Sequence, residues 1–589
     1  MNKKDLILNI LLFISQIIVF YYFFCYLFPF KEQLQMFQFT SQYLTETLKQ
    51  AGGVAIYISE FLSQFYVVFW TGPIISALLL TLVALLSSLI LKKINSRNDL
   101  PLIFLLPWLS LLIISLDYDY YEQGTIAYLF LLLFLWLYTN IKTRIKFIYG
   151  ICIIPILYGI AGPIVHLFAI SALFFEFLTN GKKKYISIIY LLIAALSAIA
   201  GTYLGYSRNL TLAFLPEAYC NPLQTVSGIY YAWYALPMTM LLVAYLKRYK
   251  EPVSLKGKCI WEGAQWAIMF LLVYQGIFHF GKLDAQHSMK QDYLLRTEQW
   301  DLVISEFNHD VLSKRRMCGL NLALAHKGQL SERLLDYPQH GIETLMLHWD
   351  QSIYTAQLHS DLYYCMGIIS AAQKFAFEAF VSSRSSGNPR MLKRLIETNL
   401  ITGSYPIADK YIQLLEKTWF YKDWATAHRR FLYNDKAVEE DKILGMKRRC
   451  WKAEASAAKL YTDPVSSLIN LLPACPDNKA GLAYLTSFLL LNKDIETYKT
   501  LQESLYRSPA WRDMTECQQE AIVICSPNDP HFWLEHGVSI KVRNRAIAFM
   551  QKVQDISRSG QNPAVALASE YGKTYWHYYC LLYTSDAAD

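Results

Sequence analysis

The sequence is poor in charge: Asp, Glu, Lys and Arg make up 17% of its 589 residues, whereas hydrophobic residues make up 54%. It contains no P-loop, no G-x-G-x-x-G fingerprint and no G-x-S-x-G elbow. The nucleotide-binding and hydrolase classes that these motifs mark therefore have no support. Its cysteines show no C-x-x-C spacing, so no zinc or dithiol motif is recognised.

The basic residues lie mostly in short loops between apolar runs, and the formal net charge of +8 is modest for this length. That distribution is typical of the positive-inside rule rather than of nucleic-acid binding. Apolar residues are concentrated before about residue 281, and the later part has the composition of a soluble protein. We therefore expect a membrane domain at residues 1–281 in contact with the lipid bilayer, then a globular half, and no nucleic-acid partner.

Nine apolar stretches are candidates to cross the roughly 30 Å of hydrocarbon in a bilayer. They are residues 6–30, 72–91, 100–116, 125–139, 147–162, 163–178, 185–206, 228–246 and 260–280. In lipid the backbone must bond to itself, so each stretch is predicted to be a helix. The first has a basic lead but no small-residue cleavage site, which indicates an uncleaved signal anchor. Residues 31–71 mix apolar and polar residues around Gly52 and Gly53, which predicts two interfacial helices.

Lysine and arginine alternate along this series of stretches. They precede the first stretch and follow the second, fourth, sixth and eighth: Lys3, Lys4, Lys92, Lys93, Arg97, Lys142, Arg144, Lys146, Lys182, Lys183, Lys184 and the basic residues of 247–258. The positive-inside rule then predicts a cytoplasmic N-terminus in a bacterial inner membrane. With nine spans, the loop "DYDYYEQ" and everything after residue 280 lie on the outer, periplasmic side.

Residues 286–579 give one helix signal after another and few strand signals, which predicts an all-α protein. The stretch "TGSYPIADKYI", with Gly403, Tyr405 and Ala408, resembles the inter-helix turn and second helix of a tetratricopeptide repeat (TPR). "KGQLSERLLDYP" at Gly328 is a looser match. This resemblance implies a TPR-like domain whose stacked helix pairs grip a protein partner. An irregular helical bundle is the alternative.

The loop "SLDYDYYEQGT" holds a D-x-D pair, Asp117 and Asp119. One interpretation is an interfacial turn with its tyrosines at headgroup depth. The layout also resembles membrane glycosyltransferases of the GT-C type, which transfer sugar from a polyprenyl-phosphate donor. That resemblance implies catalytic acids at Asp117 and Asp119, with Glu32 or Glu60 from the first outer loop, and a divalent metal as the one cofactor. His166, near the outer end of its span, could reach the same face.

Other polar residues give weaker signals. Arg208 and Glu217 lie in an outer loop and are candidates to bind a lipid phosphate, with a solvated loop as the alternative. "HFWLEH", with His531 and His536, misses the H-x-x-E-H spacing by one residue, so a capped helix start explains it better and no metal site is predicted. If the second half lies outside the cytoplasm, some of its cysteines could form disulfides, and their spacing does not show which ones pair. These cysteines are Cys318, Cys365, Cys450, Cys475, Cys517 and Cys525.

The end of the chain, "CLLYTSDAAD" at residues 580–589, matches the translation of a transposase-type sequencing adapter, and we expect it to be read-through. The whole chain resembles uncharacterised bacterial families that join a multi-spanning membrane half to a helical-repeat half. No complete catalytic constellation is visible. The sequence therefore favours a non-enzymatic scaffold in envelope assembly, and a GT-C-like glycosyltransferase is the alternative.

Overall fold

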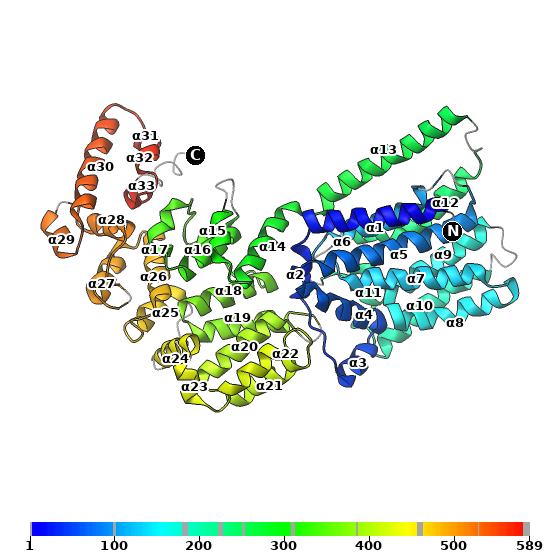
Figure 1. Ribbon diagram of the computed structural model, residues 1–589, viewed down its shortest axis with the longest axis horizontal. Helices are drawn as coiled ribbons and strands as arrows, with labels where there is room; N and C mark the ends of the chain where they lie inside the picture. Colours follow the sequence, from blue (N-terminus) through cyan, green and yellow to red (C-terminus); the bar gives the residue numbers. More distant parts are fainter. Residues whose placement is uncertain are drawn as a thin grey trace. The chain divides into compact units, whose positions relative to one another are not determined.

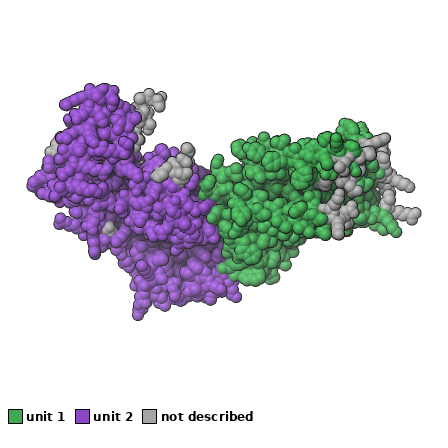
Figure 2. All heavy atoms as spheres, turned by 45° about the horizontal axis from the view of Figure 1, so that its top comes forward, with its two compact units in different colours: residues 1–289, 417–420 green, residues 290–416, 421–589 purple. Residues whose placement is uncertain are grey.

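The protein is all-α in a computed structural model that describes residues 3–580 except 98–99, 101, 180–185, 222–225, 227, 250–253, 308–312, 385–386, 456–462, 510 and 528. Within these residues there is no strand, only an isolated bridge between Tyr120 and Cys220. The all-α prediction is confirmed. Two compact units are coloured separately in Figure 2: Met1–Met289 with Lys417–Phe420 form unit 1, and Lys290–Glu416 with Tyr421–Asp589 form unit 2.

Unit 1 is a bundle of mainly apolar helices (Figure 1). They are α1 (Lys3–Phe23), α2 (Leu27–Glu32), α3 (Ser41–Leu48), α4 (Gly53–Ser63), α5 (Thr71–Ile94), α6 (Leu106–Ser115), α7 (Glu122–Asn140), α8 (Thr143–Ala161), α9 (Val165–Leu178), α10 (Ile189–Tyr203), α11 (Leu210–Phe214), α12 (Gly228–Leu246) and α13 (Leu255–Phe280). The chain passes into unit 2 within α14 (Leu283–Arg296). Gly52, at φ 77°, separates α3 from α4, and α4 packs against α7 and α8.

Among the described residues, five stretches are long and apolar enough to cross a membrane: Asp5–Phe23, Thr71–Ile94, Glu122–Asn140, Ile145–Leu178 and Gly228–Leu246. A bent pair, Lys256–Phe280 with Leu283–Arg296, would make a sixth. The prediction of nine spans is therefore wrong. Some of the predicted stretches form helices that are too short: α10 has 15 residues, or about 22 Å at 1.5 Å per residue, against the roughly 30 Å required.

The stretch Ile145–Leu178 doubles back on itself. Lys146 Nζ, near the start of α8, lies 2.5 Å from Glu176 Oε1, near the end of α9. Two residues thirty positions apart on one straight helix would be about 45 Å apart. The reversal occurs at Gly162, whose φ of 82° and ψ of −145° are favourable only for glycine. The helices α8 and α9 therefore form an antiparallel hairpin.

Contacts between helix termini define two ends of unit 1. At the first, which we call the basic end, three hydrogen bonds join the predicted basic loops: Lys92 Nζ to Asp5 Oδ2 (2.5 Å), Lys93 Nζ to Asn140 Oδ1 (2.5 Å) and Arg97 Nη1 to the Leu246 carbonyl (3.0 Å). The Lys146–Glu176 pair lies at the same end, because Tyr138 in the last turn of α7 donates to Glu176. Lys182, Lys183 and Lys184 fall outside the described residues, as do positions 250–253 and 581–589.

At the opposite end of unit 1 the chain makes its other reversals. The amide of Ala51 donates to the Tyr206 carbonyl (2.8 Å), and the amide of Gly52 donates to the Tyr158 carbonyl (3.2 Å). The loop between α6 and α7 lies at this end too. The amide of Tyr121 donates to the carbonyl of Tyr219 (3.0 Å), and the hydroxyl of Tyr219 forms hydrogen bonds with the backbone of Ala161 and Ile164. We call it the acidic-loop end.

Unit 2 consists of α15 (Trp300–Ser305), α16 (Lys314–His326), α17 (Leu330–Arg333), α18 (Ile353–Met366), α19 (Ile369–Val381), α20 (Pro389–Thr402), α21 (Tyr405–Glu416), α22 (Lys422–His428), α23 (Asp435–Glu440), α24 (Lys442–Ala455), α25 (Pro464–Leu471), α26 (Lys479–Leu491), α27 (Ile495–Leu505), α28 (Glu516–Cys525), α29 (Pro530–Glu535), α30 (Ile540–Arg558), α31 (Pro563–Ala566), α32 (Ala568–Tyr571) and α33 (Tyr575–Cys580). Successive helices from α18 to α21 pack side by side (Figure 1).

One type of turn recurs between helices of unit 2. Gly328, Gly367 and Gly403 each have a positive φ directly after a helix. At each, the glycine amide bonds the carbonyl three residues back, and the next amide bonds the carbonyl five residues back. This is the Schellman arrangement, which satisfies the last carbonyls of a helix and reverses the chain. Gly367 follows Gly328 by 39 residues, and Gly403 follows Gly367 by 36 residues.

Candidate functional site

The loop between α6 and α7, residues 117–121, is a polar segment of unit 1 that is held by hydrogen bonds. Its turn is closed by the amide of Asp119, which donates to Asp117 Oδ1 (2.9 Å). The segment after η5 (Pro216–Tyr219) fixes it from outside: Asn221 donates through its amide to the Asp119 carbonyl (2.8 Å) and through Nδ2 to Asp119 Oδ1 (3.0 Å). The two aspartates of the D-x-D pair are thus oriented by hydrogen bonds.

Lys282, in the break between α13 and α14, is shared by both aspartates. Its Nζ lies 2.8 Å from Asp117 Oδ1 and 3.1 Å from Asp119 Oδ2. The same ammonium lies 4.2 Å from the centre of the Tyr118 ring, within the range of a cation–π contact. Asp119 is fully buried, whereas about a third of the Lys282 side chain is exposed. These contacts fasten the loop to the 57° bend between α13 and α14.

A second lysine of the site, Lys31, is buried. Lys31 of α2 donates to the Ser115 carbonyl (2.9 Å), and Glu122, in the first turn of α7, accepts from Ser76 Oγ (3.2 Å). Burial lowers the pKa of the Lys31 ammonium, although the charges of Glu122 and both aspartates act in the opposite direction. We call Lys31, Asp117, Asp119, Glu122 and Lys282 the charge cluster; it combines three carboxylates with two amines.

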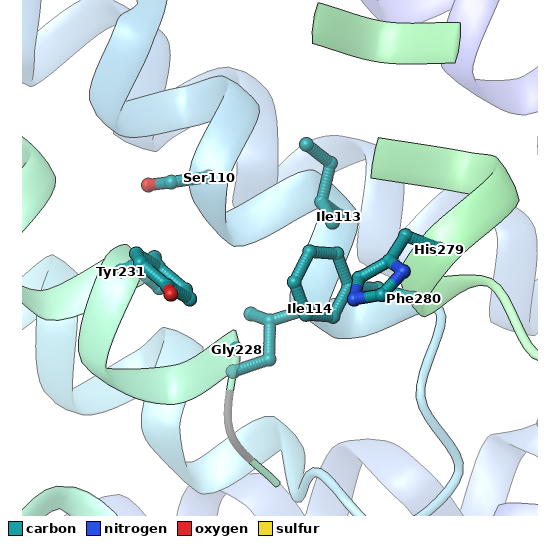
Figure 3. A pocket seen from close by; sticks show the side chains of 8 residues that line it. Ser110, Ile113, Ile114, Gly228, Tyr231, His279 and Phe280 are labelled. Carbon is teal, nitrogen blue, oxygen red and sulfur yellow. The ribbon is translucent and has the colours of Figure 1, made fainter. Parts of the chain in front are cut away.

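An apolar pocket of about 430 Å³ adjoins the charge cluster, where α6, α12 and the end of α13 meet. Ile113, Ile114, Ala232 and Phe280 line it, with Ser110, Tyr231 and His279 as its polar side chains (Figure 3). Ile114 lies one turn before Asp117, and Phe280 lies two residues before Lys282. Its size falls in the range of about 300–1,000 Å³ that is usual for small-molecule sites. The lining suits an apolar chain.

The arrangement of the aspartates limits their chemistry. Within the described part of the chain, no group of three or more His, Cys, Asp and Glu side chains is placed to hold a metal ion. In the observed arrangement the Lys282 ammonium is shared by Asp117 and Asp119. The contacts therefore describe a buried ion-pair network next to an apolar pocket.

The comparison with family models covers both units. One model matches residues 2–581, and it describes a family of unknown function, DUF6057. The chain belongs to the DUF6057 family. No curated protein and no solved structure matches it. The resemblance to an uncharacterised family is thus confirmed, and any activity of this DUF6057 protein has to be inferred from its own residues.

Of the predicted acids in this DUF6057 protein, Asp117 and Asp119 share one partner in Lys282. Glu32 lies in α2 beside Lys31, is buried, and accepts a hydrogen bond from the Gln33 side chain. Glu60 is buried in α4. Glu32 and Glu60 are thus enclosed by protein, like the D-x-D pair.

His166 and Glu217 have contact partners other than Lys282. The His166 ring stacks on Phe214, with 4.8 Å between ring centres, and its buried Nε2 has no hydrogen-bond partner in the described residues. Arg208 is exposed ahead of α11. Glu217 accepts a hydrogen bond from the Tyr230 hydroxyl (2.8 Å).

The capped helix start predicted at "HFWLEH" is present. Asp529 Oδ1 accepts hydrogen bonds from the amides of His531 and Phe532, at 3.1 and 3.0 Å, and so caps α29. His531 lies 3.3 Å from Glu535, and the ring of His536 stacks on Phe532. The two histidines therefore have different partners.

Sequence reasoning missed both lysines of the charge cluster and Asn221. Lys282 lies 163 residues from Asp119, and nothing local marks it as a partner. The one available signal was its position as the first charged residue after the last apolar stretch. Buried carboxylates need a counter-charge, so a search for basic residues near the outer span ends would have found it.

Proposed function

We propose that this DUF6057 protein is a bacterial inner-membrane scaffold that displays unit 2 outside the cytoplasm as a docking domain for envelope assembly. The observation that supports it is the separation of the two ends of unit 1. Lys92, Lys93, Arg97 and Lys146 make their contacts at the basic end, whereas the chain leaves unit 1 just after Lys282 at the acidic-loop end.

The positive-inside rule turns this separation into an orientation. Loops rich in lysine and arginine stay on the cytoplasmic side of a membrane, so the basic end would face the cytoplasm. The charge cluster and the start of unit 2 would then face the periplasm. This orientation depends on which end of unit 1 carries the basic loops, not on a count of the stretches.

The proposal that unit 2 is a TPR-like docking domain is supported by its recurring glycine turns and by exposed apolar side chains. Phe377 and Val381, one turn apart on α19, are 48% and 54% exposed, and Ile407 on α21 is 48% exposed. Exposed apolar residues on adjacent helices are a frequent feature of protein-binding surfaces. The partner we expect is an envelope protein with an apolar segment.

Protease access to the full-length protein tests the orientation. Trypsin added to intact spheroplasts should cut the lysines and arginines of unit 2 and spare those of the basic end, with the fragments identified by mass spectrometry. Inside-out vesicles are the control and should give the reverse pattern. Cleavage confined to the basic end in spheroplasts would refute the proposal.

Docking is tested by placing a photo-crosslinking amino acid at Phe377 in the full-length protein in living cells. A specific partner should give one discrete adduct, and Val381→Asp in the same chain should abolish it. Leu534→Asp is the matched control, because Leu534 is also apolar and exposed (60%) but lies on α29. Equal loss of the adduct in both variants, or no adduct at all, contradicts docking at α19.

The second candidate is a GT-C-like glycosyltransferase that uses a polyprenyl-phosphate donor. It is favoured by the apolar pocket beside Asp117 and Asp119, since a prenyl chain needs an apolar site next to its reacting phosphate. Changing both residues together, Asp117→Asn with Asp119→Asn, should remove an envelope glycan while leaving membrane insertion intact. A glycan profile equal to that of the parent strain eliminates this candidate.

A further inference from the structure

Two cysteines of unit 2 lie closer together than two separate thiols normally do. Cys450 is on α24, and Cys475 is in the turn between α25 and α26. Their Sγ atoms are 2.6 Å apart. Non-bonded heavy atoms settle at about 3.5–4.0 Å, whereas the sulfur atoms of a disulfide are about 2.05 Å apart. A small movement would convert this contact into a bond.

The surroundings of the pair exclude most other roles for it. Both residues are almost completely buried, so neither sulfur is open to a substrate. A Cβ at Gly367 would come within 3.2 Å of Cys450 Sγ, so the α18–α19 turn packs directly on the pair. Two thiols alone do not complete a zinc site, which takes four ligands. Among the described residues, no group of three or more His, Cys, Asp and Glu side chains is placed to hold a metal ion.

We propose that Cys450 and Cys475 form a structural disulfide that joins α24 to the turn before α26. Of the pairings that six cysteines allow, this is the one for which the structure places the two sulfurs together. The inference rests on the proposed function in one respect: thiols in a bacterial cytoplasm are kept reduced, and the periplasm is oxidising.

The bond would form by thiol–disulfide exchange with a periplasmic dithiol oxidase in its disulfide form. The thiolate of one cysteine attacks that disulfide, which gives a mixed disulfide and releases one oxidase thiolate. The thiolate of the second cysteine then attacks the mixed disulfide, which forms the Cys450–Cys475 bond and releases the second oxidase thiolate. Two electrons pass to the oxidase and the two thiol protons pass to the solution. Because the folded pair is buried, this exchange precedes the packing of Gly367 on Cys450.

The test uses full-length protein purified from membranes without a reducing agent. Free thiols are blocked with N-ethylmaleimide in denaturant, and the protein is digested and analysed by mass spectrometry. We expect one cross-linked species that contains Cys450 and Cys475 and disappears after reduction. As internal controls, Cys318 and Cys365 should carry the maleimide. The proposal is overturned if Cys450 and Cys475 carry it too.

The trypsin experiment on spheroplasts separates this inference from the proposed function. Alkylated Cys450 and Cys475 in a protein whose unit 2 is cut from outside would overturn the disulfide and leave the orientation standing. A disulfide in a protein whose unit 2 resists external trypsin would support the bond and contradict the orientation. Alkylated cysteines with a protected unit 2 would overturn both.

Discussion

Replacing Lys282 by methionine tests the charge cluster most directly. The change removes an ammonium 2.8 Å from Asp117 Oδ1 and 3.1 Å from Asp119 Oδ2 and keeps the apolar stem. Both carboxylates are shielded from water, with side-chain exposures of 8% and 0%. Removing one partner of a buried pair costs about 3–5 kcal/mol. Since about a third of the Lys282 side chain is exposed, we expect the lower end of that range, about 3 kcal/mol.

The assay is thermal unfolding of the full-length protein in detergent, followed by size-exclusion recovery after heating. At about 2–4 °C per kcal/mol for a domain of this size class, Lys282→Met should lower the melting temperature by about 6–12 °C. The matched control is Lys436→Met. The Lys436–Glu440 pair is 3.8 Å long and mostly exposed, and such pairs contribute about 0–1 kcal/mol.

A neutral variant separates lost charge from lost packing. In Lys282→Met combined with Asp117→Asn and Asp119→Asn, positions 117 and 119 no longer carry charges that lack their lysine partner, so this variant should regain a large part of the stability lost by Lys282→Met alone. A melting temperature of Lys282→Met equal to that of Lys436→Met would refute the reasoning. So would a triple variant no more stable than the single one.

Two further changes test other parts of the fold. Burial raises the pKa of Glu520 to about 7, above its unfolded value of about 4.3. The free energy of unfolding should therefore fall as pH rises from about 4.3 through 7. Glu520→Gln should flatten that pH dependence and raise the melting temperature at pH 8. Glu516→Gln, a change at an exposed position, should do neither. In Gly162→Ala the added Cβ would lie no closer than 3.5 Å to any neighbouring atom, but alanine would have to adopt a φ of 82°. This change should destabilise the α8–α9 hairpin by about 1–3 kcal/mol. An unchanged melting temperature contradicts that hairpin geometry.

Some of the architecture was readable from sequence because it depends on local patterns. Apolar runs and helical spacing predicted an all-α chain, and the capped start of α29 followed from Asp529 and Pro530 alone. The alternation of basic loops placed Lys92 and Arg97 on the same side as Lys146, and the structure brings these residues to one end of unit 1. These features depend on neighbours within a few residues or on a simple periodic count.

The number of spans was not readable, because length and connection matter as much as hydropathy. The apolar runs that contain α6 and α10 form helices whose length is less than the thickness of the bilayer core. The runs behind α8 and α9 merge into one stretch that reverses at Gly162. Hydropathy indicates whether a residue prefers water or an apolar environment, and it does not predict where a helix begins and ends in the folded protein.

The charge cluster was only half predicted. Asp117 and Asp119 stand out locally, whereas Lys31 and Lys282 come from α2 and from the α13–α14 break. Pairing across that much sequence is set by how the helices pack, which local patterns do not report. The Cys450–Cys475 contact was missed for the same reason.

The shortness of α10 has a consequence for the surrounding lipid. Its outward residues Leu192 and Leu196 are 61% and 55% exposed, so in a membrane they would touch acyl chains. A hydrophobic length of about 22 Å against a core of about 30 Å draws the two leaflets together around the helix. The bilayer beside α10 would thus be thinner than elsewhere, and thinner regions of a membrane would attract this protein.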